Sequence, residues 1–486
     1  MFKVAALAAV VCLFCCGATY AQGPCSTQSS ALACVIPQEY GSAHPFTLED
    51  ELFPIGQHPE HFDPAINAKL KPFAADIGTQ ANLLPIASPS SGFVLTYDPS
   101  LKTFVTSTDS LGPILGERAQ TVGRYHLAIG FSYQFFDFDK IDGVNLHDFP
   151  LVFTHEDDSH DGPPGVTCSV NGANNIGRCG FVRDRINTIN DINLKVNQYT
   201  TYVTFGLTKR IDVSAVIPVE NVRFDLSSDD TIQLGTNGFH AHLFKNCTNR
   251  GNPTADPKCL NHEFPDRPFT GSGSVGTNSA MGVGDVVARV KWNAYEGERA
   301  GFAAGMEVRF PSGDALNYLG SGSYGYKPFA VFSYRARVAP HVLVGYEWNS
   351  NSIIAGDLLT GTKGKIPNDL VYSAGVDTWL THWLTGDFDI VGQRVFSGDT
   401  VSVTTQQFLA NCGSCTADPN PNTVPLPSLA APKTQSYNIT NASMGIKIRP
   451  IGRASKLVFT ANVLVRLDDG GLGSKAAPLV GLGYTF

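Results

Sequence analysis

Charged side chains are scarce in this chain of 486 residues. Lys, Arg, Asp and Glu make up 16% of the residues, against roughly 25% in typical soluble domains. Acidic side chains outnumber basic ones, 43 against 35, so the formal net charge is -8 at pH 7. This balance excludes nucleic acid as an expected partner, because nucleic-acid binding needs a basic surface.

Long apolar runs are also missing after the first 21 residues, which excludes a bundle of membrane-spanning helices. The N-terminal run VAALAAVVCLFCC follows Lys3 and leads to small residues that end at Ala21, as in a secretory signal. Phe14 and Cys15 occupy positions where a lipoprotein signal needs small residues. We therefore expect residues 1–21 to be a cleaved signal peptide.

Cysteine is sparse, and three of the eleven lie in the signal. The CGSC sequence resembles half of a zinc or redox site, but no second CxxC lies near it and no βαβ pattern surrounds it. Neighbouring cysteines in an exported chain favour disulfides that close small loops. The predicted pairs are Cys25 with Cys34, Cys168 with Cys179, Cys247 with Cys259, and Cys412 with Cys415. No metal site and no cofactor are predicted.

What the sequence has in abundance is alternation of apolar and polar residues, the pattern of strands with one apolar face. It begins at YHLAIGFSYQF and recurs in twelve segments of roughly 10 to 14 residues, the length of a tilted membrane strand. Tight turns alternate with long connections, and this asymmetry between two rims is typical of outer-membrane barrels. The long connections are about residues 137–194, 227–281, 312–325, 353–368, 398–435 and 469–475.

The sequence therefore predicts an all-β fold, an antiparallel transmembrane β-barrel of 12 strands over residues 121–486. A soluble β-sandwich is the alternative, but it explains neither the unequal rims nor the charged faces opposite apolar ones. Residues 22–120 lack the barrel pattern and are expected to be an irregular N-terminal extension or a plug in the lumen. They contain one short hairpin pattern, FVLTYDPSLKTFVTST, which would give 14 strands if it joined the sheet.

The charge pattern indicates which face of each strand meets lipid. A charge at the bilayer midplane on the lipid face costs roughly 2–4 kcal/mol, so the charged positions must face the lumen. Their mixed signs predict ladders of ion pairs. The predicted lumen-lining residues are Asp285, Arg289, Lys291, Glu307, Arg309, Arg335, Arg337, Glu347, Asp377, Asp387, Asp389, Lys447, Arg449 and Arg466.

The chain ends in PLVGLGYTF, in which Val480, Leu482, Tyr484 and Phe486 share one face. An unpaired apolar strand would invite aggregation, so this segment is predicted to pair with the first strand and close the barrel. It resembles the C-terminal signal recognised by the barrel assembly machinery. The expected location is the outer membrane of a Gram-negative-type bacterium, with lipid, lipopolysaccharide and that machinery as partners.

Several blocks carry a resemblance to a known family. GRYHLAIGFSYQFFDFDKIDG and the blocks GVGD, RFPSGD and LGSGS, which lie between residues 282 and 323, are similar to outer-membrane proteins associated with meta-pathway phenol degradation. The resemblance covers about residues 120–486. It implies a barrel related to channels for fatty acids and aromatic hydrocarbons, which have 14 strands and an N-terminal hatch. It also implies passive uptake of small apolar or aromatic substrates, and it supplies no catalytic residue.

Two other functions stay open at this point. A charged lumen favours a non-specific aqueous porin, whereas a filled lumen favours a closed structural or surface-binding barrel. An enzyme is not expected. HEDDSH (155–160) spaces its histidines five apart instead of the four of a zinc-binding helix. GSGSYG (320–325) lies between strands and is expected to be a flexible external loop, and His341 is expected at a periplasmic turn.

Overall fold

A computed structural model describes residues 24–25, 31–36, 73, 75–80, 84–85, 95–98, 103–106, 110–154, 185–233, 279–358, 360–409, 423–450 and 456–486. The predicted signal peptide, the HEDDSH motif and the predicted pairs Cys168–Cys179, Cys247–Cys259 and Cys412–Cys415 lie outside these residues. Within the described part of the chain, no helix is long and apolar enough to cross a membrane.

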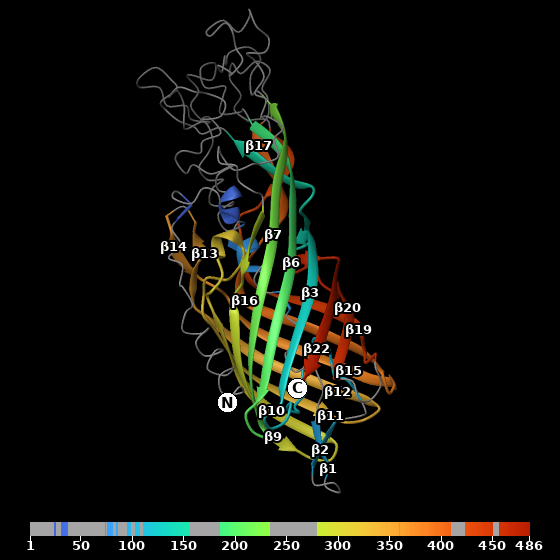
Figure 1. The fold of residues 1–486 in the computed structure, drawn as a ribbon. Coiled ribbons are helices and arrows are strands. Elements are labelled where there is room, and N and C mark those ends of the chain that lie inside the picture. The colour runs from blue at the N-terminus through green and yellow to red at the C-terminus, as the bar shows by residue number, and fades with distance from the viewer. Residues whose placement is uncertain are drawn as a thin grey trace, which may run out of the picture.

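A closed antiparallel barrel of twelve strands dominates the described residues and confirms the predicted fold class (Figure 1). Neighbours in the wall follow chain order, and the last strand pairs with the first from Leu479↔Gln134 to Thr485↔Ala128. In order, the wall strands are β3 (Leu127–Ile141), β6 (Arg185–Gly206), β7 (Ile211–Gln233), β9 (Val286–Glu296), β10 (Ala300–Phe310), β11 (Gly325–Tyr334), β12 (Val338–Asn349), β15 (Asn368–Thr381), β16 (Leu384–Thr400), β19 (Lys433–Ile448), β20 (Leu457–Arg466) and β22 (Ala476–Thr485).

The two rims of the barrel differ as the sequence predicts. Tight turns such as 207–210 and 335–337 form one rim, which faces the periplasm in barrels of this kind. β6 and β7 extend beyond their neighbours at the other rim (Figure 1). The long outer connections contain β4 (Val144–Asn145), β5 (Phe149–Thr154), β8 (Ser279–Val283), η5 (Ala315–Asn317), β13 (Asn351–Asp357), β14 (Thr362–Lys365), β17 (Val403–Leu409), β18 (Thr423–Leu429) and β21 (Leu472–Ser474).

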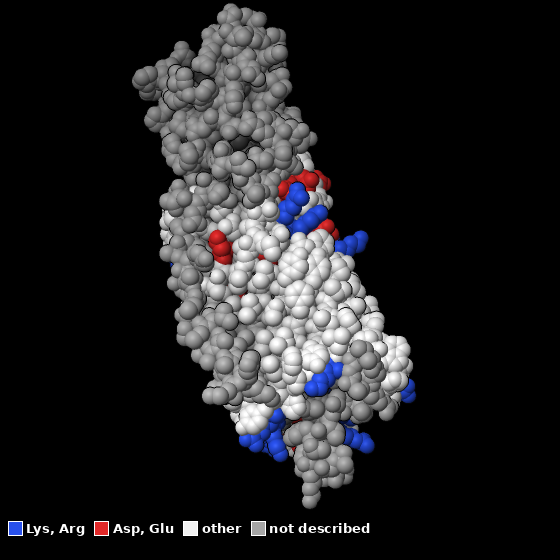
Figure 2. Space-filling view, viewed as in Figure 1, with Lys and Arg blue, Asp and Glu red and all other residues white. Residues whose placement is uncertain are grey.

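The wall is apolar outside and polar inside. On β9, Val290 and Trp292 are 46% and 51% exposed, whereas the intervening Lys291 is 3% exposed. The visible surface is largely uncharged across its middle, and charged side chains gather toward the ends (Figure 2). Because period-two alternation sends successive side chains to opposite faces, the same pattern runs around the wall. This is the polarity of a barrel that spans a bilayer.

The described N-terminal segments do not add strands to the wall. β1 (Leu95–Asp98) and β2 (Thr103–Thr106) pair only with each other among the described strands, so the barrel has 12 strands and not 14. Two other parts of the segment pack against the barrel. We call residues 110–122 the strap. We call the described residues 24–25, 31–36, 73 and 75–80 the outer cap, which includes η1 (Leu32–Cys34).

Candidate functional site

The strap occupies the periplasmic end of the lumen. Thr121 Oγ1 donates a hydrogen bond to the carbonyl of Lys209 in a periplasmic turn (3.0 Å), and the N–H of Leu111 donates to Thr385 Oγ1 near the start of β16 (3.0 Å). Residues 110–122 form no helix or strand. Their backbone groups are buried, so they must find partners on the wall.

Acidic side chains of β15 and β16 bind one part of the strap. Asp387 Oδ2 accepts a hydrogen bond from the N–H of Ile114 (3.0 Å), and Asp389 Oδ2 accepts one from Gly116 (2.9 Å). Asp377, which lies directly opposite Asp387 in the sheet, forms an ion pair with Arg118. These predicted lumen residues therefore act as acceptors for the strap rather than as the lining of an open pore.

Basic side chains bind the next part of the strap. Glu117 Oε2 lies 2.8 Å from Arg289 Nη1, and its Oε1 lies 2.7 Å from Lys291 Nζ. Lys291 also donates to the carbonyls of Arg118 (3.1 Å) and Gln120 (2.8 Å). All three ionic side chains are less than 10% exposed. Glu117 was not predicted as a site residue, because its segment shows no alternation of apolar and polar residues that would indicate where each side chain points.

Lys447 holds the start of the strap from the other side of the lumen. Its Nζ donates to the carbonyls of Pro113 (2.5 Å) and Leu111 (3.3 Å). Val122, at the far end, donates its N–H to Asp212 Oδ2 on β7 (3.0 Å). The strap is thus bound along its whole length by wall residues of both signs.

His341 lies in the lumen wall, so its predicted position at a periplasmic turn is wrong. It is 1% exposed, with Nε2 2.6 Å from Asp389 Oδ1 and Nδ1 3.4 Å from Asp377 Oδ1. His341, Asp387 and Asp389 offer ligand atoms within 4.8 Å of one another, a spacing that suits a metal. The strap already fills this space, because a Cβ at Gly116 would overlap His341 Nε2. We assign the cluster to strap docking.

The position of the turn before His341 also explains why two of the predicted arginines do not lie in the lumen wall. The turn between β11 and β12 is at 335–337 and not beside His341, and Pro340 lies within β12. Arg337 is consequently exposed, with its guanidinium 5.5 Å from the Trp379 ring centre, and its predicted lumen position is wrong. Arg335 lies in the turn beside Glu296.

Ion pairs form a ladder across neighbouring strands above the strap. Glu307 on β10 lies opposite both Arg289 on β9 and Lys327 on β11. Glu307 Oε1 is 2.5 Å from Lys327 Nζ, and Arg309 Nη2 is 3.1 Å from Glu347 Oε1. The sequence indicated that these strands carry lumenal charges, but it did not single out Lys327.

The remaining two predicted arginines mark the ends of the lumen. Arg449 follows β19 directly and is buried, 3% exposed. Arg466, at the outer end of β20, lies 2.9 Å from Asp468 Oδ1.

A cavity of about 220 Å³ lies between the strap and residues 84–85. One part of its lining is the ionic ladder, and the rest is largely apolar. The lining residues are Leu84, Pro85, Leu115, Glu117, Val216, Val287, Arg289, Glu307, Arg309, Lys327, Phe329, Leu343, Glu347, Val371, Tyr372, Ser373, Val391, Gly392, Gln393, Ile439 and Asn441.

The strand that contains β8 and β9 is interrupted just before Val287, which lines this cavity, although both parts pair with β7. Gly284 and Asp285 interrupt the run from β8 to β9, and in the described sheet β8 pairs with β7 alone. Asp285 accepts hydrogen bonds from the N–H groups of Gly313 (3.1 Å) and Ser321 (2.8 Å). The GSGSYG segment lies in an outer connection, as predicted, and it is packed against the wall with Ser321 1% exposed. The carboxylate of Asp285 is thus the point where the three sequence blocks GVGD, RFPSGD and LGSGS meet.

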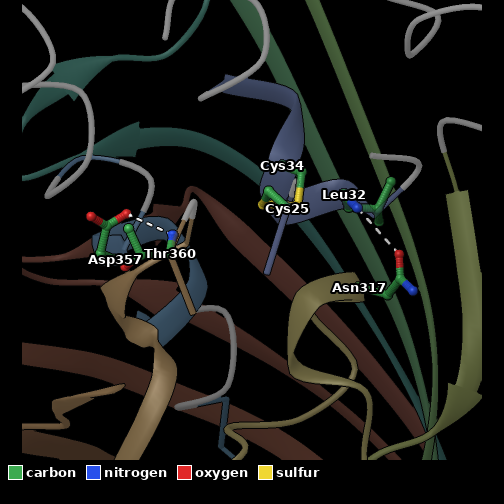
Figure 3. The surroundings of a disulfide bond; sticks show 6 residues. All are labelled: Cys25, Leu32, Cys34, Asn317, Asp357 and Thr360. Carbon is green, nitrogen blue, oxygen red and sulfur yellow. Dashed lines mark hydrogen bonds between the residues drawn. A yellow bond between two sulfur atoms is a disulfide. The ribbon is translucent and has the colours of Figure 1, made fainter. Parts of the chain in front are cut away.

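The outer cap packs against the outer connections through apolar side chains. Leu32, Ile36, Phe73 and Ile77 belong to one buried cluster with side chains of the outer connections, and Phe73 stacks on Phe149 with ring centres 4.7 Å apart. Cys25 and Cys34 form a disulfide, and the N–H of Leu32 donates to Asn317 Oδ1 (3.2 Å) (Figure 3).

One side chain of the cap, Asp76, is buried in an unfavourable environment. Burial raises the pKa of Asp76 well above its usual value, with further contributions from Asp142 and Asp399. Burial also raises the pKa of Asp142, although the N–H groups of Val401 and Gly471 oppose this. Asp76 Oδ2 has no hydrogen-bond partner among the described residues.

Comparisons with known structures return bacterial outer-membrane channels. The COG4313 outer membrane channel from Pseudomonas putida F1 is 10% identical, with a TM-score of 0.41 over 75% of this chain and 96% of that one. A FadL homologue from Pseudomonas aeruginosa is 10% identical, with a TM-score of 0.24 over 74% and 90%. The CymD monoaromatic hydrocarbon channel is 11% identical, with a TM-score of 0.23 over 75% and 88%. No protein-family model and no curated protein sequence matches the chain.

Strand order, closure and the polarity of the two faces define the class of this protein. It is a twelve-stranded outer-membrane β-barrel of the Gram-negative type. Its lumen is occupied by the strap at the periplasmic end and bounded by the outer cap at the other.

Proposed function

We propose that the protein is a passive channel for small, apolar or aromatic molecules, gated by the strap. The cavity carries this proposal, because a largely apolar chamber within a barrel lumen suits a solute with an apolar body. For scale, a cavity of about 150 Å³ lined by apolar side chains binds benzene. The resemblance of residues 120–486 to proteins associated with phenol degradation supports an aromatic substrate.

The strap suits a gate because ion pairs and hydrogen bonds, which can break and re-form, attach it to the wall. An ideal Cβ built at Gly301 lies 3.1 Å from the Cβ of Ala119 in the strap, close to the separation of roughly 3.5–4.5 Å in disulfides. The variant Ala119→Cys/Gly301→Cys should therefore lock the strap when oxidised. We expect solute flux into liposomes to fall about tenfold and to return after reduction.

Three comparisons make this experiment decisive. The wild type under the same reductant controls for Cys25–Cys34, and Ala119→Cys alone controls for the substitution. Equal flux through the oxidised and reduced double variant would contradict a moving strap. Flux of sucrose as fast as that of benzyl alcohol would instead favour the alternative of a non-specific aqueous porin.

The break between β8 and β9 supports a second, lateral exit for apolar solutes. Asp285 holds the 311–324 connection beside the break through the N–H groups of Gly313 and Ser321. Release of this connection would expose the edge of β8 to the outer half of the bilayer. If the solute leaves sideways, Asp285→Ala should accelerate its transfer from the barrel lumen into vesicle lipid without a rise in ion conductance.

We propose that the last strand also serves as the signal for the barrel assembly machinery. Val480, Leu482, Tyr484 and Phe486 are all at least 40% exposed on the outward face, and the N–H of Phe486 donates to the carbonyl of Leu127 (2.7 Å). Phe486→Ala should lower the amount of folded barrel in the outer membrane severalfold. Unchanged folded yield in cells would contradict this role.

A further inference from the structure

We infer that the lumen cavity selects small amphipathic acids, molecules with a ring-sized apolar body and one carboxylate. The inference rests on the proposed function and names the substrate class of the same cavity. It comes from two features of the lining. Hydrogen-bond donors are left over on the ionic ladder, and the space beside them is apolar and small.

The carboxylates of the ladder are already well supplied with cations. Glu307 lies 2.5 Å from Lys327 and 3.8 Å from Arg289. Glu347 lies 3.1 Å from Arg309 and 3.7 Å from Lys327. Each of these two acids therefore has two cationic neighbours, so a positively charged solute would meet no free carboxylate on this part of the lining.

The donors are not all used. Arg309 Nε and Ser373 Oγ are buried and have no hydrogen-bond partner among the described residues. Arg289 Nε likewise has no hydrogen bond there, and its ion-pair contact to Glu307 Oε2 is 3.8 Å long. All three residues line the cavity. Buried donors without acceptors are costly, and a carboxylate offers two oxygens with about four acceptor positions. We expect an anionic head group at this part of the lining to accept charge-assisted hydrogen bonds from the arginines.

The rest of the cavity limits the body of the solute. Leu115 from the strap, together with Val391 and Ile439 from the wall, contributes apolar lining. The guanidinium of Arg289 lies 4.2 Å from the centre of the Phe329 ring, which holds the guanidinium beside an aromatic surface. A volume of about 220 Å³ holds one ring with a short substituent but not a long acyl chain.

The test measures equilibrium binding to the purified full-length protein in detergent by calorimetry. The probes are benzoate, benzyl alcohol and benzylamine, which share a ring and differ in head group. We expect benzoate to bind about tenfold more tightly than benzyl alcohol, and benzylamine to bind more weakly than either. Equal affinity for benzoate and benzyl alcohol, or tightest binding of benzylamine, would overturn the inference.

Two variants of the cavity and one control locate the binding. Arg309→Met should weaken benzoate about tenfold or more while changing benzyl alcohol less than about twofold. Ser373→Ala keeps every charge and should weaken benzoate about threefold, so it tests the site even if Arg309→Met fails to fold. Arg394→Met makes the same substitution at an exposed position of β16 and should change nothing. Benzoate affinity that survives both cavity variants would overturn the assignment.

Binding and flux separate this inference from the proposed function. Tight benzoate binding without strap-dependent flux would refute the channel and leave the acid site standing. Strap-dependent flux of benzyl alcohol without a preference for benzoate would support the channel and refute the acid site.

Discussion

The strap and the outer cap are both parts of the N-terminal segment, and both pack against the barrel, yet they are held by different forces. The strap buries Leu111 and Ile114 in small apolar clusters with the wall, but most of its side-chain and backbone attachments are to carboxylates and cations of the wall. The cap is bound by a buried apolar cluster and contains a disulfide.

This difference indicates different tasks. Apolar burial is not directional, so it stabilises the cap without an exact alignment of donors and acceptors. Ion pairs and hydrogen bonds are directional and cost much when broken singly, so we expect the strap to be either fully bound or fully released. The cap therefore suits a permanent outer closure, whereas the strap suits a gate.

Removal of the strap carboxylate should have the largest effect. Glu117→Ala leaves Arg289 and Lys291 buried without their partner, which costs about 3–5 kcal/mol. We expect the strap to leave the lumen and single-channel conductance to rise, while the cap stays in place. Planar-bilayer recordings measure the conductance, and hydrogen exchange measures protection of residues 31–36. Glu298→Ala, in an exposed turn, is the matched control; conductance equal in both variants would contradict the docking role of Glu117.

Loss of the disulfide should act on the cap and leave the strap alone. Cys25 and Cys34 are separated by 9 positions, and a loop of this length contributes about 2–3 kcal/mol in the chain-entropy account. Cys25→Ser/Cys34→Ser should therefore speed hydrogen exchange in residues 31–36 and 75–80. Protection of residues 110–122 should not change. Equally faster hydrogen exchange in the strap would show that the strap and the cap form one cooperative unit, and would contradict the difference drawn between them.

The smallest effect should come from pH. Folding raises the pKa of Asp76, so the folded cap binds this proton more tightly than the unfolded chain does. The cap is then most stable below the ordinary carboxyl pKa and loses stability as pH rises through the raised value. We expect weaker protection of residues 75–80 at pH 8 than at pH 5, after correction for intrinsic exchange.

Asp76→Asn should remove most of this pH dependence and stabilise the cap at pH 8 by about 1 kcal/mol. Asp148→Asn, at an exposed position of the same rim, is the control and should keep the wild-type dependence. A wild-type pH profile in Asp76→Asn would place the titrating group elsewhere.

The wall of the barrel was predictable because two strong constraints act on single strands. Alternation fixes the two faces, and the cost of a charge in lipid fixes which face is inward, as Lys291 and Trp292 on β9 show. The positions of turns were harder to predict from the sequence. Pro340 is an exposed strand residue just beyond the last β11–β12 pair at His341. A proline at this point favours a turn, and for this reason the predicted positions of the turn, His341, Arg335 and Arg337 were wrong.

The sequence by itself determined a twelve-stranded barrel with an apolar outer face, because period-two patterning is a local property that each strand carries alone. Only the tertiary structure decided what fills that barrel. The strap has no period, and its partners lie far along the chain, as with Leu111 and Lys447, which are 336 positions apart. Glu117 became a site residue, and a cavity of about 220 Å³ formed, only when the closed wall brought these groups together.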